Sequence, residues 1–218
     1  MLKWRIPSRA LAQPLRKQDR QVPAGHAGLL LSLRRSGAKA CGMLLQPLSP
    51  HPANPSPPGM QISASWSMVQ RGRLALEYRV DDPHDHALWP ISPIGRTDGL
   101  WQHSCFEAFV AQGDGAAYAE FNISPSGAWA AYAFDDYRAG MRDLELANPP
   151  AVDQPTQGIW QVSLDLCGLD ALLGARPWRL ALTAVIEARD GSTSLWSLRH
   201  PPAKPDFHHA DCFAARLA

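Results

Sequence analysis

Two acidic residues stand among apolar ones in segments that alternate with the period of a β-strand. Glu107 lies in LWQHSCFEAFV, residues 100–110, and Glu120 and Asn122 lie in YAEFNI, residues 118–123. Alternation puts Glu120 and Asn122 on one strand face, which a neighbouring strand could extend with Glu107. Like charges across strands repel, so a shared face would need a cation, a proton or a ligand. Paired carboxylates also suggest glycoside hydrolysis, whereas a solvated face is the plain alternative.

A second cluster of polar and aromatic residues occupies the loop GRTDGLWQH, residues 95–103. The guanidinium of Arg96 offers a planar fork of donors, and the Asp98 carboxylate accepts hydrogen bonds from hydroxyl groups. Trp101 offers a flat apolar face for a sugar ring, and His103 follows it. This set suits a carbohydrate or polyol. The alternative is a surface ion pair between Arg96 and Asp98 with Trp101 packed beneath it.

A third cluster is the proline-rich segment RHPPAKPDFHH, residues 199–209. Rigid loops hold side chains at a low cost in conformational entropy, and we expect His200 and Lys204 to line the rim of a ligand site. Three His and one Asp raise the question of a metal. The spacing is loose, and adjacent residues such as His208 and His209 point to opposite faces of a strand, so no metal site is expected.

The motifs of several common enzyme classes are absent. The sequence contains no phosphate-binding P-loop, no GxGxxG, no GxSxG and no HExxH. We therefore expect a binding protein rather than an enzyme, without a bound cofactor. Acid–base chemistry by Glu107 and Glu120 is kept as the catalytic alternative.

Short strands must hold these clusters in place. Period-2 alternation recurs along the chain between turns rich in Gly, Pro, Asp and Ser. Hairpins are predicted around residues 71–72 and 124–127, a short helix or turn at 168–175, and an extended lead-in at 46–59, which holds six prolines. Further strands are predicted at residues 100–110, 160–166, 178–187 and 195–198. The pattern predicts an all-β protein, an antiparallel β-sandwich or jelly roll with few short helices.

Charge divides the chain near residue 42. Residues 1–42 hold nine Lys or Arg and one Asp, although the whole chain has a formal net charge of +1. We expect a basic, disordered extension over 1–42, or a start placed too early, and a domain over 43–218. Nucleic-acid binding is not expected, because aromatic residues are not interleaved with the charges. No run of 18 apolar residues exists, so no membrane span is expected.

The cysteines favour a reducing compartment. None of the four forms a CxxC pair, so a structural zinc site is not expected. Cys105, Cys167 and Cys212 are an odd number among apolar, strand-like residues, which predicts reduced, buried thiols and a cytoplasmic protein. Secretion stays open, although the apolar run AGLLLSL is short and its arginines follow rather than precede it.

Three blocks of sequence resemble one known family. GRTDGLWQHSCFEAFV, YAEFNISPSGAWAAYAFDDYRAGM and LRHPPAKPDFHH are similar to the bacterial DOMON-like proteins, which are related to type 9 carbohydrate-binding modules and to the DOMON domains of extracellular haem and sugar binders. The resemblance covers residues 43–218 and implies an immunoglobulin-like β-sandwich with a ligand pocket. Relatives bind sugar ends through stacked Trp and polar side chains, or b-type haem through Met and His.

The clusters and the resemblance together predict a non-catalytic β-sandwich that binds a small molecule, a carbohydrate or polyol. The expected ligand-binding residues are Arg96, Asp98, Trp101, His103, Glu107, Glu120, Asn122, His200 and Lys204. Haem is an alternative, with Met68 or Met141 and His103 or His200 as candidate iron ligands, although no motif supports either pair. Glycoside hydrolase-like chemistry and a protein-interaction module are further alternatives, and the oligomeric state is left open.

Overall fold

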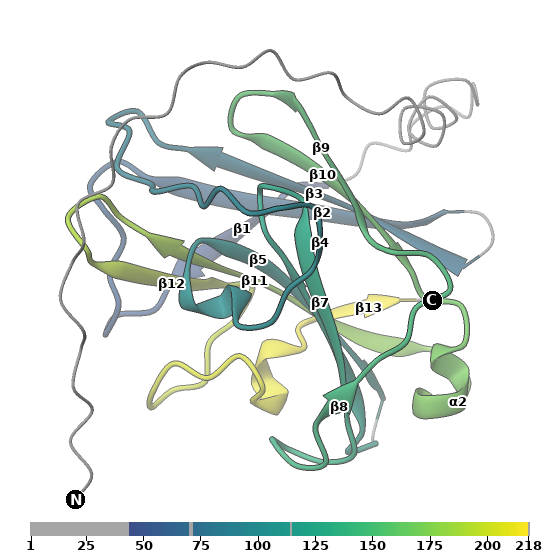
Figure 1. Ribbon diagram of the computed structural model, residues 1–218. Coiled ribbons are helices and arrows are strands. Elements are labelled where there is room, and N and C mark those ends of the chain that lie inside the picture. Colours follow the sequence, from purple (N-terminus) through teal and green to yellow (C-terminus); the bar gives the residue numbers. More distant parts are fainter. Residues whose placement is uncertain (1–43, 70–71, 114, 218) are drawn as a thin grey trace, which may run out of the picture. The chain divides into compact units, whose positions relative to one another are not determined.

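The computed structural model describes residues 44–69, 72–113 and 115–217, so the expectation for residues 1–42 lies outside the described residues. In this part of the chain the protein is mostly β, as predicted (Figure 1). The strands are β1 (Gln46–Pro50), β2 (Gln61–Val69), β3 (Arg73–Asp81), β4 (Gly95–Arg96), β5 (Cys105–Gln112), β6 (Tyr118–Ile123), β7 (Ala128–Phe134), β8 (Arg142–Asp143), β9 (Ala151–Thr156), β10 (Ile159–Asp165), β11 (Trp178–Glu187), β12 (Thr193–Ser197) and β13 (Ala215–Leu217). The helical elements are α2 (Leu169–Leu173) and single 3-10 turns at Leu100–Gln102 and Ala210–Cys212. None of the described helices is long and apolar enough to span a membrane.

The strands form one curled, mixed sheet that turns at β1. The order is β4-β7-β6-β5-β11-β12-β1-β2-β3-β10-β9, and β13 and β8 attach to β11 and β7. Among the described strands every pair is antiparallel except β4 with β7, which run parallel. The antiparallel pairing expected from the sequence holds for every described pair but this one, in which β4, two residues long, runs beside β7 in the same direction.

The main core lies between β2, β3 and β10 on one side and β5, β6 and β11 on the other. The rings of Tyr78 and Phe106 stack with centroids 4.4 Å apart, and Trp160 contacts Phe106 at 5.3 Å. The Tyr78 hydroxyl donates a hydrogen bond to the main-chain oxygen of Glu107 at 2.7 Å. Strand β3 therefore supports β5 at Glu107, whose side chain points away from the main core.

The opposite surface of β5, β6, β7 and β11 carries a second, smaller cluster, and we call this surface the pocket face. The hairpin of β6 and β7 is confirmed, with Tyr118 opposite Phe134 and Ile123 opposite Trp129. In β6, Phe121 and Ile123 enter the main core. Alternation therefore leaves Tyr118, Glu120 and Asn122 on the pocket face, where Tyr118 packs in the second cluster.

Three expectations need correction. The strand predicted at 100–110 begins at Cys105, because Gly99 takes a left-handed φ of 75° and starts a 3-10 turn instead. The proline-rich lead-in includes β1, whose first three residues pair only with β2 and whose last two pair only with β12. One-sided pairing lets a proline keep its missing amide on the unpaired side. Cys167, predicted to be buried, is exposed, because it follows β10 in a turn.

Candidate functional site

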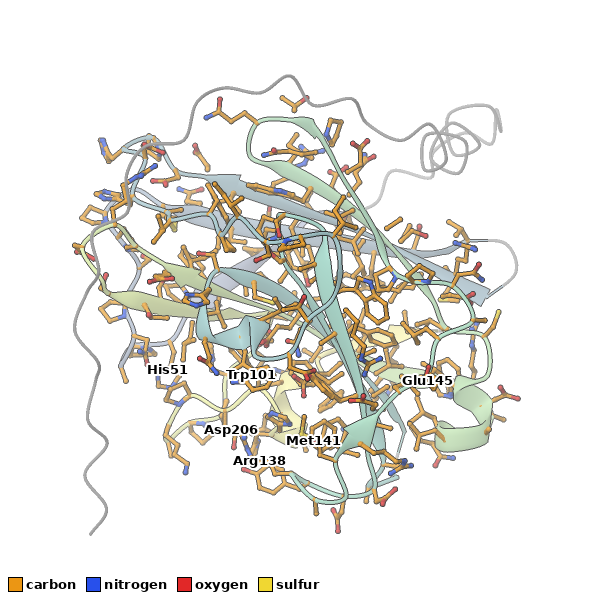
Figure 2. All side chains as sticks on the ribbon, in the orientation of Figure 1. His51, Trp101, Arg138, Met141, Glu145 and Asp206 are labelled. Carbon is orange, nitrogen blue, oxygen red and sulfur yellow. The ribbon has the colours of Figure 1, made fainter. Side chains whose placement is uncertain are left out.

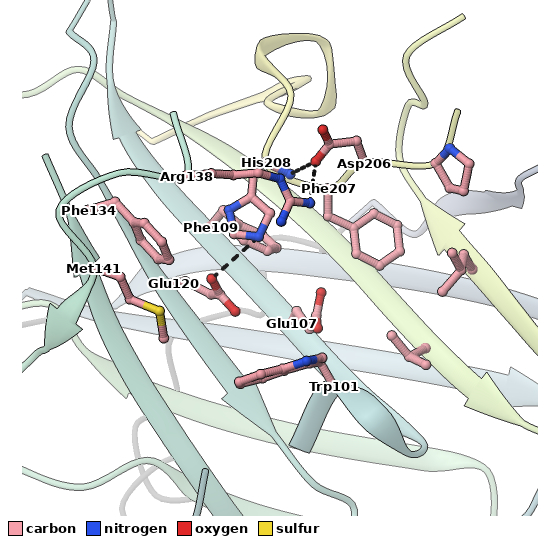
Figure 3. Close-up of a pocket in the computed structure, with 13 residues that line it drawn as sticks. Trp101, Glu107, Phe109, Glu120, Phe134, Arg138, Met141, Asp206, Phe207 and His208 are labelled. Carbon is pink, nitrogen blue, oxygen red and sulfur yellow. Dashed lines mark hydrogen bonds and ion pairs between the residues drawn. The ribbon is translucent and has the colours of Figure 1, made fainter. Parts of the chain in front are cut away.

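A pocket of about 390 Å³ lies over β5 and β6 on the pocket face (Figure 3). The lining residues are Trp101, Glu107, Phe109, Glu120, Phe134, Arg138, Met141, Val185, Leu195, Pro205, Asp206, Phe207 and His208. Strands supply the floor, while the segments 135–141 and 205–208 supply walls. In the close-up, Glu107 and Glu120 lie between Trp101 on one side and His208 and Arg138 on the other.

The two glutamates are diagonal neighbours on adjacent strands. Glu107 pairs directly with Asn122, and Phe109 pairs with Glu120. Diagonal residues of an antiparallel pair lie about 7–8 Å apart, so the two carboxyl groups share one polar patch. Glu107 is 2% exposed and Glu120 is 5% exposed.

Each buried carboxyl group receives one close hydrogen bond. Thr183 Oγ1 donates to Glu107 Oε2 at 2.9 Å, and Asn122 Nδ2 donates to Glu120 Oε1 at 2.7 Å. His208 Nε2 lies 3.9 Å from Glu120 Oε2. No described residue donates a hydrogen bond to the second oxygen of Glu107, so this atom faces the pocket with its acceptor capacity unused.

Burial changes the protonation states of the titratable side chains in the pocket. Burial and the nearby Glu120 charge raise the pKa of Glu107 to about 8, against the opposing effects of Thr183 and Arg138. Burial also raises the pKa of Glu120, although the Asn122 hydrogen bond and Arg138 oppose the shift. Burial, helped by the Arg138 charge, lowers the pKa of His208 to about 4. At neutral pH the imidazole is therefore uncharged and Glu107 largely carries a proton.

A polar clamp holds the wall that carries His208 against the sheet. Arg138 donates to Asp206 Oδ1 at 2.7 Å, and the Tyr137 hydroxyl donates to Asp206 Oδ2. The Tyr118 hydroxyl lies 2.7 Å from His208 Nδ1 and accepts a hydrogen bond from the Arg138 amide. Burial opposes ionisation of Asp206, but the bonds from Arg138 and Tyr137 lower its pKa overall, so the clamp is an ion pair.

Trp101 stands at the edge of the pocket with 41% of its surface exposed. Its ring meets Tyr132 edge-on, with centroids 6.1 Å apart. Trp101 and Met141 also line a neighbouring hollow of about 350 Å³, to which Asp98 contributes. The Tyr132 hydroxyl donates to Asp98 Oδ1 at 2.7 Å. The two hollows therefore share Trp101 and Met141 as lining residues.

The structure brings together part of the predicted set. Trp101, Glu107 and Glu120 line the pocket, Asn122 supports Glu120 from beneath, and Asp98 lies in the neighbouring hollow.

The other four predicted residues lie elsewhere in the structure. Arg96 donates to the main-chain oxygens of Ala131 and Leu144 and so braces the β4 edge. His103 pairs with Glu187 at 2.8 Å, His200 bonds the Ser49 oxygen, and Lys204 is exposed. Arg96 and His200 therefore do not line the pocket with the two glutamates, because main-chain acceptors elsewhere hold both side chains.

Ten lining residues were not among the predicted ligand-binding residues: Phe109, Phe134, Arg138, Met141, Val185, Leu195, Pro205, Asp206, Phe207 and His208. Side chains two residues apart in a strand point to the same face, so the position of Phe109, two residues after Glu107, could have indicated that it lines the pocket. Arg138 and Asp206 meet across 68 residues of sequence, and no local pattern indicates such a pair. Within the described residues, no group of three His, Cys, Asp or Glu side chains is arranged to hold a metal.

The residues present do not fit b-type haem. Met141 and His208 both line the pocket, but Tyr118 engages one ring nitrogen of His208 and the Glu120 carboxyl lies beside the other. Two buried carboxyl groups would also face the apolar macrocycle, which carries a desolvation cost. The other candidate methionine, Met68, packs against the main core.

The fold has a counterpart among solved structures. The chain is similar to a crystal structure from Bacteroides uniformis ATCC 8492, described as a "putative carbohydrate-binding protein", with a TM-score of 0.59 and 15% identity over 88% of this chain and 89% of that chain. At this identity the likeness establishes a shared fold. Neither the protein-family models nor the curated proteins include a match to this sequence.

Proposed function

We propose that the protein binds a carbohydrate or polyol in the pocket without transforming it. The observation that supports this most is the composition of the pocket: aromatic rings surround a buried floor of hydrogen-bonding groups. A volume of about 390 Å³ lies within the usual size range of ligand pockets. Sugars have the matching two-sided chemistry, because apolar C–H faces lie next to hydroxyl groups.

Each part of the pocket has a role in this proposal. The exposed face of Trp101 stacks on the ring of the sugar. Glu107 and Glu120 bind hydroxyl groups, and a protonated Glu107 both donates and accepts. Asp98 in the neighbouring hollow binds a substituent or a second sugar unit. The fold shared with the Bacteroides protein supports the proposal, as does the resemblance to DOMON-like sandwiches.

The arrangement of the carboxyl groups favours binding over hydrolysis. In glycosidases two carboxyl groups flank the scissile bond from different sides. Here Glu107 and Glu120 rise from adjacent strands of one floor. A sugar lying on this floor would have both groups on the same side.

Calorimetric titration with a panel of hexoses, sugar acids and alditols tests the proposal. We expect at least one member to bind, and Trp101→Ala to weaken it about 10-fold through loss of ring stacking. Ile91→Ala is the matched control, because Ile91 is 89% exposed and lies outside the pocket lining. Failure of every sugar and polyol to bind would overturn the proposal.

A further inference from the structure

Acceptor atoms outnumber donors on the pocket floor. The Oδ1 atom of Asn122, a fully buried residue, has no hydrogen-bond partner among the described residues. The second oxygen of Glu107 has none either. The second oxygen of Glu120 faces only an uncharged imidazole at 3.9 Å. Apart from the proton on Glu107, the described residues donate no hydrogen bond to these three oxygens, so a ligand that donates hydrogen bonds would complement the patch.

The charged side chains that line the pocket are mostly acidic. The lining includes three carboxyl groups, those of Glu107, Glu120 and Asp206, and one cationic side chain, Arg138. Arg138 is already engaged by Asp206 in the polar clamp. The Arg138 charge lowers the pKa of both glutamates, but its direct ion pair is with Asp206, so a ligand could supply a cation closer to the two glutamates.

We propose that the ligand carries a primary ammonium group that lies between Glu107 and Glu120, which makes an amino sugar or amino polyol the preferred ligand. This inference rests on the proposed function and specifies its ligand class. An ammonium group has three donors and no acceptor, which complements the free oxygens of Glu107 and Glu120 that line the pocket. The rings of Trp101, Phe109 and Phe134 add favourable faces for a cation.

Binding is expected to displace a proton. Several groups act on the glutamate pair through a hydrogen bond or their charge: Thr183 on β11, Tyr132 on β7, Tyr118 and Asn122 on β6, Cys105 on β5, Tyr78 on β3, Arg138 on the 135–141 segment and His208 on the C-terminal segment. Asp206 lines the same pocket and pairs with Arg138. A cation placed beside Glu107 favours its ionised form. At pH 7 the carboxyl group then releases up to about one proton to the buffer.

Titration of matched ligand pairs at pH 7 tests the inference. The pairs are glucosamine with glucose and 1-amino-1-deoxyglucitol with glucitol, and N-acetylglucosamine is an uncharged amide control. We expect the amines to bind at least 10-fold more tightly than their parents. Titrations in two buffers of different ionisation enthalpy should show proton release for the aminoglucitol.

The outcomes separate the inference from the proposed function. Equal binding of amines and neutral parents would overturn the inference and leave carbohydrate binding intact. Binding of the aminoglucitol alone would support the inference and narrow the function to amines. Failure of all five compounds would overturn the inference. Binding of Ca²⁺ from added CaCl2, with none of the five compounds bound, would assign the patch to a metal and would also overturn the inference.

Neutral variants test the residues. Glu107→Gln and Glu120→Gln retain side-chain shape, and each is expected to weaken amine binding at least 10-fold while changing binding of the neutral parent less than 3-fold. Glu145→Gln is the matched control, since Glu145 is exposed and lies away from the pocket (Figure 2). Two variants keep the test valid if one fails to fold, as thermal denaturation would reveal. Unchanged amine binding in a folded glutamate variant would contradict the inference.

Discussion

Glu107 and Glu120 lose the water that would solvate their charges, and each receives a single close hydrogen bond in return. A carboxylate in this situation is stabilised by protonation or by a cation. The raised pKa values and the proposed ammonium ligand are therefore two consequences of one arrangement. Burial of the pair therefore lowers the stability of the ligand-free protein.

Stability should consequently fall as the pH rises. The pKa of Glu107 is raised from 4.5 to about 8, so the folded protein keeps a proton that the unfolded chain releases. This contribution is complete below about pH 4.5 and is lost as the pH rises through about 8. Between pH 6 and pH 9, urea unfolding should show a fall in the free energy of unfolding that is about 3 kcal/mol larger in the wild type than in Glu107→Gln. Parallel pH profiles would contradict the assignment of a buried, protonated Glu107.

At the scale of elements, a strand floor and a clamped C-terminal segment make the pocket. The alternation in β6 was readable from sequence, since Phe121 and Ile123 mark the core side and Glu120 and Asn122 the other. The wall was not readable, because Arg138 and Asp206 come from segments without regular structure and meet only in three dimensions. Gly99, with its left-handed φ, similarly moves Trp101 out of the predicted strand and to the edge of the pocket.

The clamp should contribute more to stability than a surface ion pair of similar appearance. Arg138 and Arg142 are 52% and 50% exposed, but their partners differ: Asp206 is 6% exposed and Asp135 is 64% exposed. Arg138→Ala leaves a buried carboxylate without its cation, and we expect a loss of about 1–3 kcal/mol in the free energy of unfolding. Arg142→Ala should cost less than about 0.5 kcal/mol. Chemical denaturation of both variants is the measurement, and equal losses would show that the clamp does not hold the wall.

At the scale of the whole molecule, the all-β class followed from short alternating segments and their turns, and the structure agrees. Strand β1 joins the two sides of the curled sheet. This could not be predicted, because six prolines between residues 46 and 59 hide the sequence pattern of a strand. The parallel contact of β4 with β7 was also hidden, since two residues carry no periodic signal. Long-range pairing, rather than local propensity, sets these features.

The domain boundary can be tested directly. We propose that residues 43–218 fold without the basic segment, because the described core uses no residue before Leu48. A chain that begins at Met43 should unfold within about 3 °C of the full chain, which corresponds to less than about 1 kcal/mol at this size. Thermal denaturation followed by circular dichroism is the measurement. A much lower midpoint would show that residues 1–42 stabilise the fold.

The most direct test of the central claim is a crystal structure of the full chain grown with the tightest-binding amino sugar or polyol from the titrations. The account predicts density for the ligand in the pocket, with its ring against Trp101 and a polar group within hydrogen-bonding distance of Glu107 or Glu120. Ligand bound at another surface, with the pocket occupied only by water, would contradict it.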